Sequence, residues 1–149
     1  MIRILSVAAI LAVGATIAYA QGAGGAAAIA DRKAAMKAVA GANKGLSDMA
    51  KGDVPFDAAK AAAGFKTLED NFVKSKGLYG DDAKTGDTAA LPAVWEKKAD
   101  FQAKMDKAIA DAKAAGAAST TEAAFKEQHK SFASSCGGCH KDYRAPPKK

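Results

Sequence analysis

The sequence predicts an all-α protein, an antiparallel four-helix bundle. Apolar residues recur at spacings of three and four in four separate blocks, as on the buried faces of amphipathic helices. Alanine and lysine, which enter helices at little entropic cost, are abundant, whereas β-branched residues are few and no alternating strand pattern is present. Mostly short connections between the blocks favour a bundle, with a looser helical array as the weaker alternative.

The first twenty residues have the form of an export signal. Arg3 supplies one early positive charge, an apolar run extends from Ile4 to about Ala18, and the segment ends on Ala18-Tyr19-Ala20. Signal peptidases recognise such small residues, and the run is short for a membrane span, which needs roughly 20 residues. We therefore expect cleavage after Ala20 and a periplasmic protein; an uncleaved N-terminal anchor is the alternative.

With residues 1–20 as the signal peptide, residues 21–149 have the size of one domain. The chain carries 22 basic and 16 acidic residues, and loss of Arg3 leaves a net charge of about +5 (21 − 16). The charges are interspersed, which favours a solvated surface first and acidic partners second. No basic stretch is interleaved with aromatic residues, so a nucleic-acid partner is not expected. The sequence contains no second apolar segment that could cross a membrane, so no membrane contact is expected after cleavage.

The first two predicted helices, about residues 26–50 and 56–74, are separated by the stretch KGDVPF. Gly52 suits the end of the first helix, and Asp53 or Asp57 can cap the second. The predicted buried faces are Ile29, Met36, Val39, Asn43 and Leu46 in the first helix, and Ala61, Phe65, Leu68 and Phe72 in the second.

A long loop rich in glycine and aspartate, residues 74–91, precedes the third predicted helix, which opens near Pro92 and runs to about Ala115. The fourth helix opens at STTE, where Ser119 and Glu122 have capping-box spacing. The predicted faces are Val94 or Trp95, Phe101, Met105, Ala108 and Ala112 in the third helix, and Phe125, Gln128, Phe132, Ser135, Cys139 and Tyr143 in the fourth.

The only two cysteines, Cys136 and Cys139, are followed directly by His140, one of two histidines. Zinc would need about four ligands, and His129 lies eleven residues earlier (140 − 129) on the same predicted helix, roughly 16 Å away. A thioredoxin-like dithiol expects a strand-to-helix setting that this chain lacks. A disulfide within one helical turn would close too small a loop to add much stability.

Cys-x-x-Cys-His in an exported chain instead predicts covalent attachment of one haem c. Residues at i and i+3 lie on one helical face, so Cys136 and Cys139 can both reach the vinyl groups of one porphyrin, and His140 can ligate its iron. The tail after His140, KDYRAPPKK, contains no methionine or histidine. A sixth ligand must therefore come from earlier in the chain, which excludes the small cytochromes whose motif is N-terminal and is followed by a methionine.

This C-terminal motif, with Tyr143-Arg144 behind it on the last of four helices, resembles that of the class II c-type cytochromes. That family contains cytochrome c′ and its low-spin, methionine-ligated relatives. Arg32 and Met36 in the first helix, KGDVPFD at the first turn and LPAVW opening the third helix extend the resemblance over essentially the whole mature chain. The resemblance implies a cytochrome c′-like bundle holding one covalently bound haem c.

The resemblance also implies that Met36 faces the distal side of the haem. An apolar residue at this position leaves the iron of cytochrome c′ five-coordinate, whereas a methionine supplies the sixth ligand in the low-spin relatives. Antiparallel packing of the first and fourth helices favours Met36 over Met49, at the opposite end, and over Met105, a core residue of the third helix. We favour ligation, because a soft thioether is a competent ligand; the alternative is that Met36 fills core space.

Two arginines complete the predicted site by resemblance. Arg32, one turn before the distal methionine, pairs with a haem propionate, and Arg144, one turn after the axial histidine, lies by the proximal face. The alternatives are a solvated arginine for Arg32 and a favourable interaction with the helix C-terminus for Arg144. Tyr143 and Trp95 pack on the porphyrin edge or in the core, and His129 is expected at the surface.

These residues predict a periplasmic monohaem cytochrome that carries electrons, with His140 and Met36 on the iron and an unidentified, acidic redox partner. The rival is a five-coordinate protein that binds nitric oxide or carbon monoxide, with Met36 only as a distal gate. An enzyme such as a peroxidase is not expected, because no distal histidine or acid–base pair is present. The attachment motif argues against a purely structural bundle, and the sequence leaves open whether two bundles form a homodimer.

Overall fold

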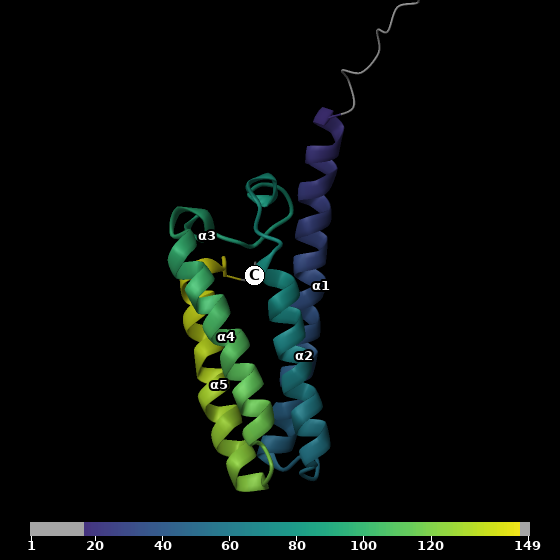
Figure 1. Cartoon of the computed structure of the whole chain (residues 1–149), viewed down its shortest axis with the longest axis vertical. Helices are drawn as coiled ribbons and strands as arrows, with labels where there is room; N and C mark the ends of the chain where they lie inside the picture. Colours follow the sequence, from purple (N-terminus) through teal and green to yellow (C-terminus); the bar gives the residue numbers. More distant parts are fainter. Residues whose placement is uncertain (1–16, 147–149) are drawn as a thin grey trace, which may run out of the picture.

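The computed structural model describes residues 17–146, with side chains from Gly24 onward. Four long helices are joined by short turns at one end and by one long connection at the other (Figure 1). The long helices are α1 (Ile17–Lys51), α2 (Ala58–Lys76), α4 (Lys98–Ala118) and α5 (Glu122–Tyr143). The long connection between α2 and α4 contains the short helices η1 (Asp81–Ala83) and α3 (Ala93–Glu96).

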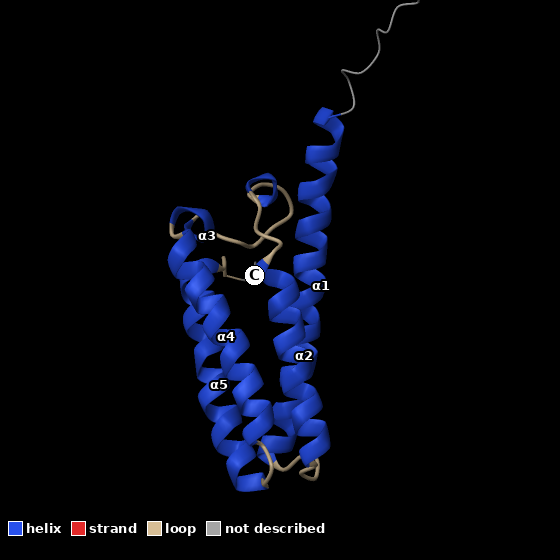
Figure 2. Cartoon of the chain, viewed as in Figure 1, coloured by secondary structure: helices blue, strands red, loops and turns tan. Residues whose placement is uncertain are grey.

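Successive long helices run antiparallel, and α1 packs chiefly on α2, α2 on α4, and α4 on α5. Within residues 17–146 the only β-type pairing is one isolated bridge, so helices and loops make up the fold (Figure 2). The predicted all-α four-helix bundle is confirmed. No helix in this part of the chain combines the length and apolar character that crossing a membrane requires.

The predicted signal peptide lies mostly outside the described residues, since these begin at residue 17. Cleavage after Ala20 would shorten α1 to residues 21–51 and leave the rest of that helix in the mature protein.

The turn between α1 and α2 uses the residues that the sequence predicts. Gly52 follows α1 with a φ of 83°, a conformation that glycine adopts without steric cost. The side chain of Asp57 accepts a hydrogen bond from the backbone N–H of Lys60 at 3.0 Å and caps α2. Asp57, rather than Asp53, is therefore the cap.

Helix α1 begins at Ile17, earlier than the predicted start near residue 26, and two further boundaries differ from the prediction. The third predicted helix is broken at Lys97 into α3 and α4, because α3 turns so that the Trp95 indole donates to backbone carbonyls of the long connection. Helix α5 is capped by Thr121, whose side chain accepts from Ala124 N at 3.3 Å. The Ser119 hydroxyl instead donates to the Ala115 carbonyl at 2.6 Å and satisfies the end of α4.

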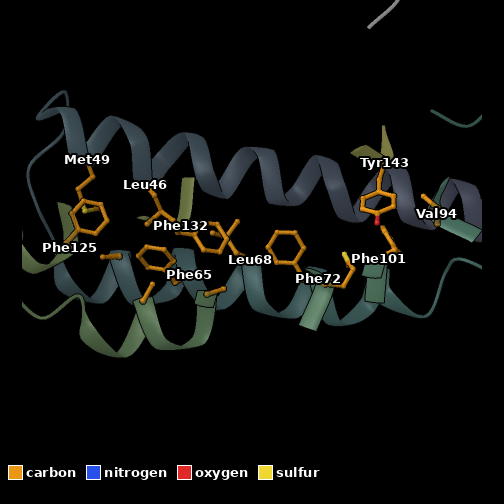
Figure 3. Close-up of a cluster of buried hydrophobic side chains, with 14 residues drawn as sticks. Leu46, Met49, Phe65, Leu68, Phe72, Val94, Phe101, Phe125, Phe132 and Tyr143 are labelled. Atoms are coloured by element: carbon orange, nitrogen blue, oxygen red, sulfur yellow. The ribbon is translucent and has the colours of Figure 1, made fainter. Parts of the chain in front are cut away.

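A single aromatic-rich core runs along the bundle (Figure 3). Phe65 of α2 makes edge-to-face contacts with Phe125 and Phe132 of α5, with ring centroids 6.4 and 5.8 Å apart. Met49 lies beside Phe125, and Met105 is buried in the same core, as predicted. Several positions of the predicted buried faces are only partly buried, and one, Ser135, is exposed. The partly buried positions are Met36, Val39, Asn43, Ala108, Gln128 and Cys139.

The long connection lies directly on α1 at Gly25. A Cβ atom at this position would stand 2.1 Å from the carbonyl oxygen of Asp82, so only glycine permits the contact. Gly41, also within α1, has open space where its Cβ would be. A Cβ atom would therefore clash at Gly25 but would meet nothing at Gly41.

Gly25→Ala is expected to lower the free energy of unfolding of the mature protein by about 1–3 kcal/mol, the usual cost of overpacking. Gly41→Ala is the matched control and should raise it by up to about 1 kcal/mol through helix propensity. Chemical denaturation of both variants measures the difference. Equal stability of the two variants would contradict the close contact between Gly25 and Asp82.

Candidate haem-attachment site

The cysteines of the motif lie on the last turns of α5. Cys136 and Cys139 are three residues apart, and both are half-buried free thiols that pack against the core. The Cys136 sulfur lies 3.8 Å from the carbonyl oxygen of Phe132. Burial raises the pKa of both thiols. The helix thus presents two neutral thiols on one side, as two thioether bonds to a single porphyrin require.

His140 directly follows the second cysteine and is accessible to solvent. Partial burial, with a further contribution from the positive charge of Arg144, lowers the pKa of its imidazole. This shift favours the neutral imidazole, which is the form that ligates a metal. Arg144 itself is exposed, and its backbone N–H donates to the His140 carbonyl at 3.1 Å at the end of α5.

The register between α1 and α5 brings Met36 opposite His140. Ser47 of α1 contacts His129 of α5, with 3.1 Å between Oγ and Nε2. Met36 lies eleven residues before Ser47 (47 − 36), and His140 eleven residues after His129 (140 − 129). Eleven residues are about three helical turns, or roughly 16 Å. Because both helices are unbroken here and run antiparallel, Met36 and His140 lie at about the same level. The spacing of eleven residues also returns each of them to nearly the same side of its helix as Ser47 and His129.

Met36 is half-buried and packs against the same core cluster as Cys136 and Cys139. At this end of the bundle, the ribbons of α1 and α5 stand further apart than at the end where Ser47 meets His129 (Figure 1). The predicted ligands and attachment residues are thus collected at the end where the two helices diverge.

Arg32 lies one turn before Met36 and is buried, with 4% of its surface exposed. Its guanidinium donates to the carbonyl of Leu78 at 3.1 Å, to the carbonyl of Ala83 at 3.5 Å and to the hydroxyl of Thr88 at 2.6 Å. It also stands 4.7 Å from the ring centroid of Tyr79. Burial lowers the pKa of this guanidinium, although arginine stays charged in proteins.

No ion pair between side chains in the part of the chain that the structure describes involves Arg32. The protein therefore surrounds this buried cation with neutral acceptors and an aromatic face. Buried charges are stable when hydrogen-bonded and paired, and a carboxylate of a bound group would complete the pairing.

Residues 78–91, which we call the strap, cross the end of the bundle from α2 to α3 and contact the end of α5. Ala90 forms an antiparallel bridge with Arg144. Leu91 N donates to the Tyr143 carbonyl at 3.0 Å, and Ala145 N donates to the Ala89 carbonyl at 2.8 Å. The strap thus joins the helix that carries Met36 to the helix that carries the cysteines and His140.

A group of aromatic residues lines this end of the bundle. Tyr79 of the strap packs on Phe101 and Trp95, with ring centroids 4.6 and 6.3 Å apart, and Phe101 packs on Tyr143. The Trp95 indole N–H donates to the carbonyls of Tyr79 and Gly80 at 3.2 and 3.1 Å. These contacts fix the strap against α3 and α4, and Phe101 in turn contacts Tyr143 of α5.

The Tyr143 hydroxyl donates to the carboxylate of Asp100. This hydrogen bond, with burial and the nearby negative charge, raises the pKa of Tyr143 to about 12. The phenol therefore remains a neutral donor at physiological pH.

The sequence did not indicate the roles of Tyr79 and Thr88 at the site, and it misjudged His129, which lies about three helical turns away from it. Tyr79 and Thr88 lie in a loop without periodicity, and an aromatic residue amid glycines (GLYG) was the only available signal. His129 was expected at the surface, but it is half-buried between Ser47 and the Phe125 ring, 6.0 Å away between centroids. The hydrogen bond to Ser47 explains why a histidine is retained in this interface.

The donor set fits a haem c. Two sulfurs stand on one face of α5, an imidazole follows them, and a thioether lies at the same level on α1. These are the residue types that form two thioether bonds to a porphyrin and can occupy both axial positions of its iron.

Comparisons with known proteins agree with this site. A family model described as Cytochrome C' matches residues 27–144. The chain is 37% identical over 145 residues to the cytochrome c' of Rhodopseudomonas palustris, with 97% of each chain covered. It is 36% identical over 114 residues to the cytochrome c-556 of Agrobacterium fabrum, covering 76% of this chain and 77% of the relative.

The solved structure of cytochrome c' from Rhodopseudomonas palustris superimposes with a TM-score of 0.77 and 38% identity, covering 81% of this chain and 98% of that one. The relatives thus include both cytochrome c' and cytochrome c-556. The chain belongs to the cytochrome c′ family of class II c-type cytochromes, which bind a covalently attached haem c, and is a haem protein rather than an enzyme.

Proposed function

We propose that this protein is an exported electron carrier in which His140 and Met36 both ligate the haem iron. The observation that carries the proposal is the register between α1 and α5, which puts a half-buried thioether level with the imidazole of the attachment motif. The bound haem supplies the one-electron chemistry, and methionine ligation raises its reduction potential.

The residues of the chain would act as follows. Cys136 and Cys139 hold the porphyrin on α5, and the neutral imidazole of His140 is available as the proximal ligand. Met36 occupies the distal position and excludes external ligands. Arg32 supports propionate binding, since its buried charge lacks an acidic side-chain partner among the described residues. Arg144 lies by the proximal ligand and disfavours protonation of the imidazole.

Absorption spectra test the ligation directly. We expect the parent to be low-spin when ferric and when ferrous, and to bind carbon monoxide slowly. In Met36→Leu the ferrous iron should become high-spin, with carbon monoxide binding at least about tenfold tighter because the competent state is no longer a minor population. Met49→Leu, at the far end of the same helix, is the matched control and should keep the parental spectrum.

The rival function, gas binding at an open iron, predicts a different spectrum for the parent protein. A high-spin ferrous parent that binds carbon monoxide readily would contradict ligation by Met36 and indicate a gas-binding protein with an open iron. An unchanged spectrum in Met36→Leu would also contradict ligation by Met36.

Export and the nature of the partner complete the proposal. The N-terminal segment favours cleavage after Ala20 and a periplasmic location, which N-terminal sequencing of the mature protein tests. The mature net charge of about +5 favours an acidic redox partner, and its association rate should fall as ionic strength rises.

A further inference from the structure

We infer that Thr88 is a positioning residue that keeps Met36 at the iron, because its side chain joins the two helices that carry the axial ligands. This inference rests on the proposed function, in which Met36 is a ligand. Thr88 lies in the strap and is half-buried. It would act through the two helices that it connects, without touching the iron or Met36.

The Thr88 hydroxyl oxygen accepts two hydrogen bonds from two different segments of the chain. One comes from Arg32 Nη2 of α1 at 2.6 Å, and the other from the backbone N–H of Ala90 at 3.0 Å. Ala90 in turn forms the bridge to Arg144 at the end of α5. A continuous chain of contacts therefore runs from α1 through one threonine oxygen to α5.

This connection lies just beyond the level of the two ligands. Arg32 is one turn before Met36 on α1, and Arg144 is one turn after His140 on α5. On the other side the two helices are joined about three turns away, where Ser47 meets His129. Met36 and His140 thus lie between two connections, and the strap is the nearer one. It is therefore the connection that sets the separation of the helices at the iron.

The strap has other anchors that do not involve Thr88. Arg32 also donates to the carbonyls of Leu78 and Ala83, and Trp95 holds the carbonyls of Tyr79 and Gly80. Loss of the Thr88 hydroxyl therefore leaves the strap in place and removes only the direct connection from Arg32 toward α5. This selectivity makes Thr88 a sharper test than Arg32, because replacing Arg32 would remove its hydrogen bonds to Leu78, Ala83 and Thr88 at once.

Releasing this connection is expected to let α1 move away from α5 in a fraction of the molecules. A thioether is a weak ligand whose bond depends on close placement, so Met36 would leave the iron more often. An external ligand binds only the open population, so its binding rate measures that population. Loss of one partly buried hydrogen-bond acceptor should raise the rate of carbon monoxide binding about tenfold.

The experiment uses the mature, haem-loaded protein and the variants Thr88→Val and Thr88→Ala. Both variants remove the hydroxyl, and the same effect in both shows that it does not come from the packing of the valine side chain. Thr88→Ser retains the hydroxyl and should restore parental behaviour. The matched control is Thr85→Val, in the same strap, because Thr85 takes part in no hydrogen bond among the described residues. Three quantities are measured: the carbon monoxide binding rate, the spin state, and hydrogen exchange at the Ala90 amide.

We expect faster binding, a larger high-spin fraction and faster Ala90 exchange in Thr88→Val and Thr88→Ala only. The double variant Met36→Leu/Thr88→Val should bind carbon monoxide at the rate of Met36→Leu alone, because the threonine acts through the methionine. If Thr88→Val accelerates binding equally in the Met36→Leu background, the strap is a steric barrier and the inference is overturned.

Failure of this inference can be distinguished from failure of the proposed function. A low-spin parent with unchanged carbon monoxide binding in both Thr88 variants would overturn the role of Thr88 and leave Met36 as a ligand. A high-spin parent would overturn the proposed function itself, and with it the positioning role.

Discussion

Replacing both cysteines, Cys136→Ala and Cys139→Ala, is expected to abolish covalent haem attachment completely. The two thiols are the only cysteines of the chain, so the variant has no sulfur left that could form a thioether bond to the porphyrin. After export and denaturation, the parent polypeptide should retain its pigment and the mass of one haem. The double variant should retain neither.

A matched control uses the two serines directly before the motif, Ser134→Ala and Ser135→Ala. Their hydroxyls donate only to carbonyls of their own helix, so the control changes two neighbouring small polar side chains of α5 without touching a sulfur. It should keep the covalent pigment in full. Persistence of bound pigment in the denatured cysteine variant would contradict the attachment site.

Phe65→Ala is expected to lower the free energy of unfolding by about 3–5 kcal/mol, the typical cost of removing a buried phenylalanine ring. Phe65 is completely buried and stands edge-to-face against Phe125 and Phe132. A Cβ atom at Gly116 of α4 would lie only 3.2 Å from the Cβ of Phe65. The two helices therefore already approach each other closely here, which limits how far α4 can move to close the cavity.

Val73→Ala, in the same helix, is the control because 54% of the valine surface is exposed. It should change the free energy of unfolding by no more than about 0.5 kcal/mol. Chemical denaturation of the two variants and the parent provides the comparison. Similar losses in both variants would contradict the assignment of the core to the face that contains Phe65.

The helices could be predicted because their signals are local. The spacing of Phe65, Leu68 and Phe72 predicts the buried face of α2 directly, and Asp57 lies where a cap is needed. Two boundaries failed for different reasons. Tertiary contacts of Trp95 override the continuous periodicity across Lys97, and the STTE stretch offers several hydroxyls with capping ability, of which the local backbone selects Thr121.

The site residues likewise differ in whether a local pattern predicts them. The attachment motif is contiguous in one helix, so its chemistry can be predicted from five residues. That Met36 lies level with His140 depends on the register between two distant helices. The family resemblance and the expected antiparallel packing of the first and fourth helices suggest this placement, and the contact of Ser47 with His129 supplies the register. The bonds of Arg32 to the strap span more than forty residues and follow no period, so no pattern predicts them.

The pairing of the strap with the end of α5 has a consequence for the order in which the protein matures. Residues 89–91 find their partners in residues 143–145, more than fifty positions later. Closing so long a loop is entropically costly before the rest of the bundle has formed. This end of the molecule should therefore be the last to assemble during biogenesis. The two cysteines, which lie shortly before residues 143–145, would stay accessible to the machinery that attaches the haem until this pairing forms.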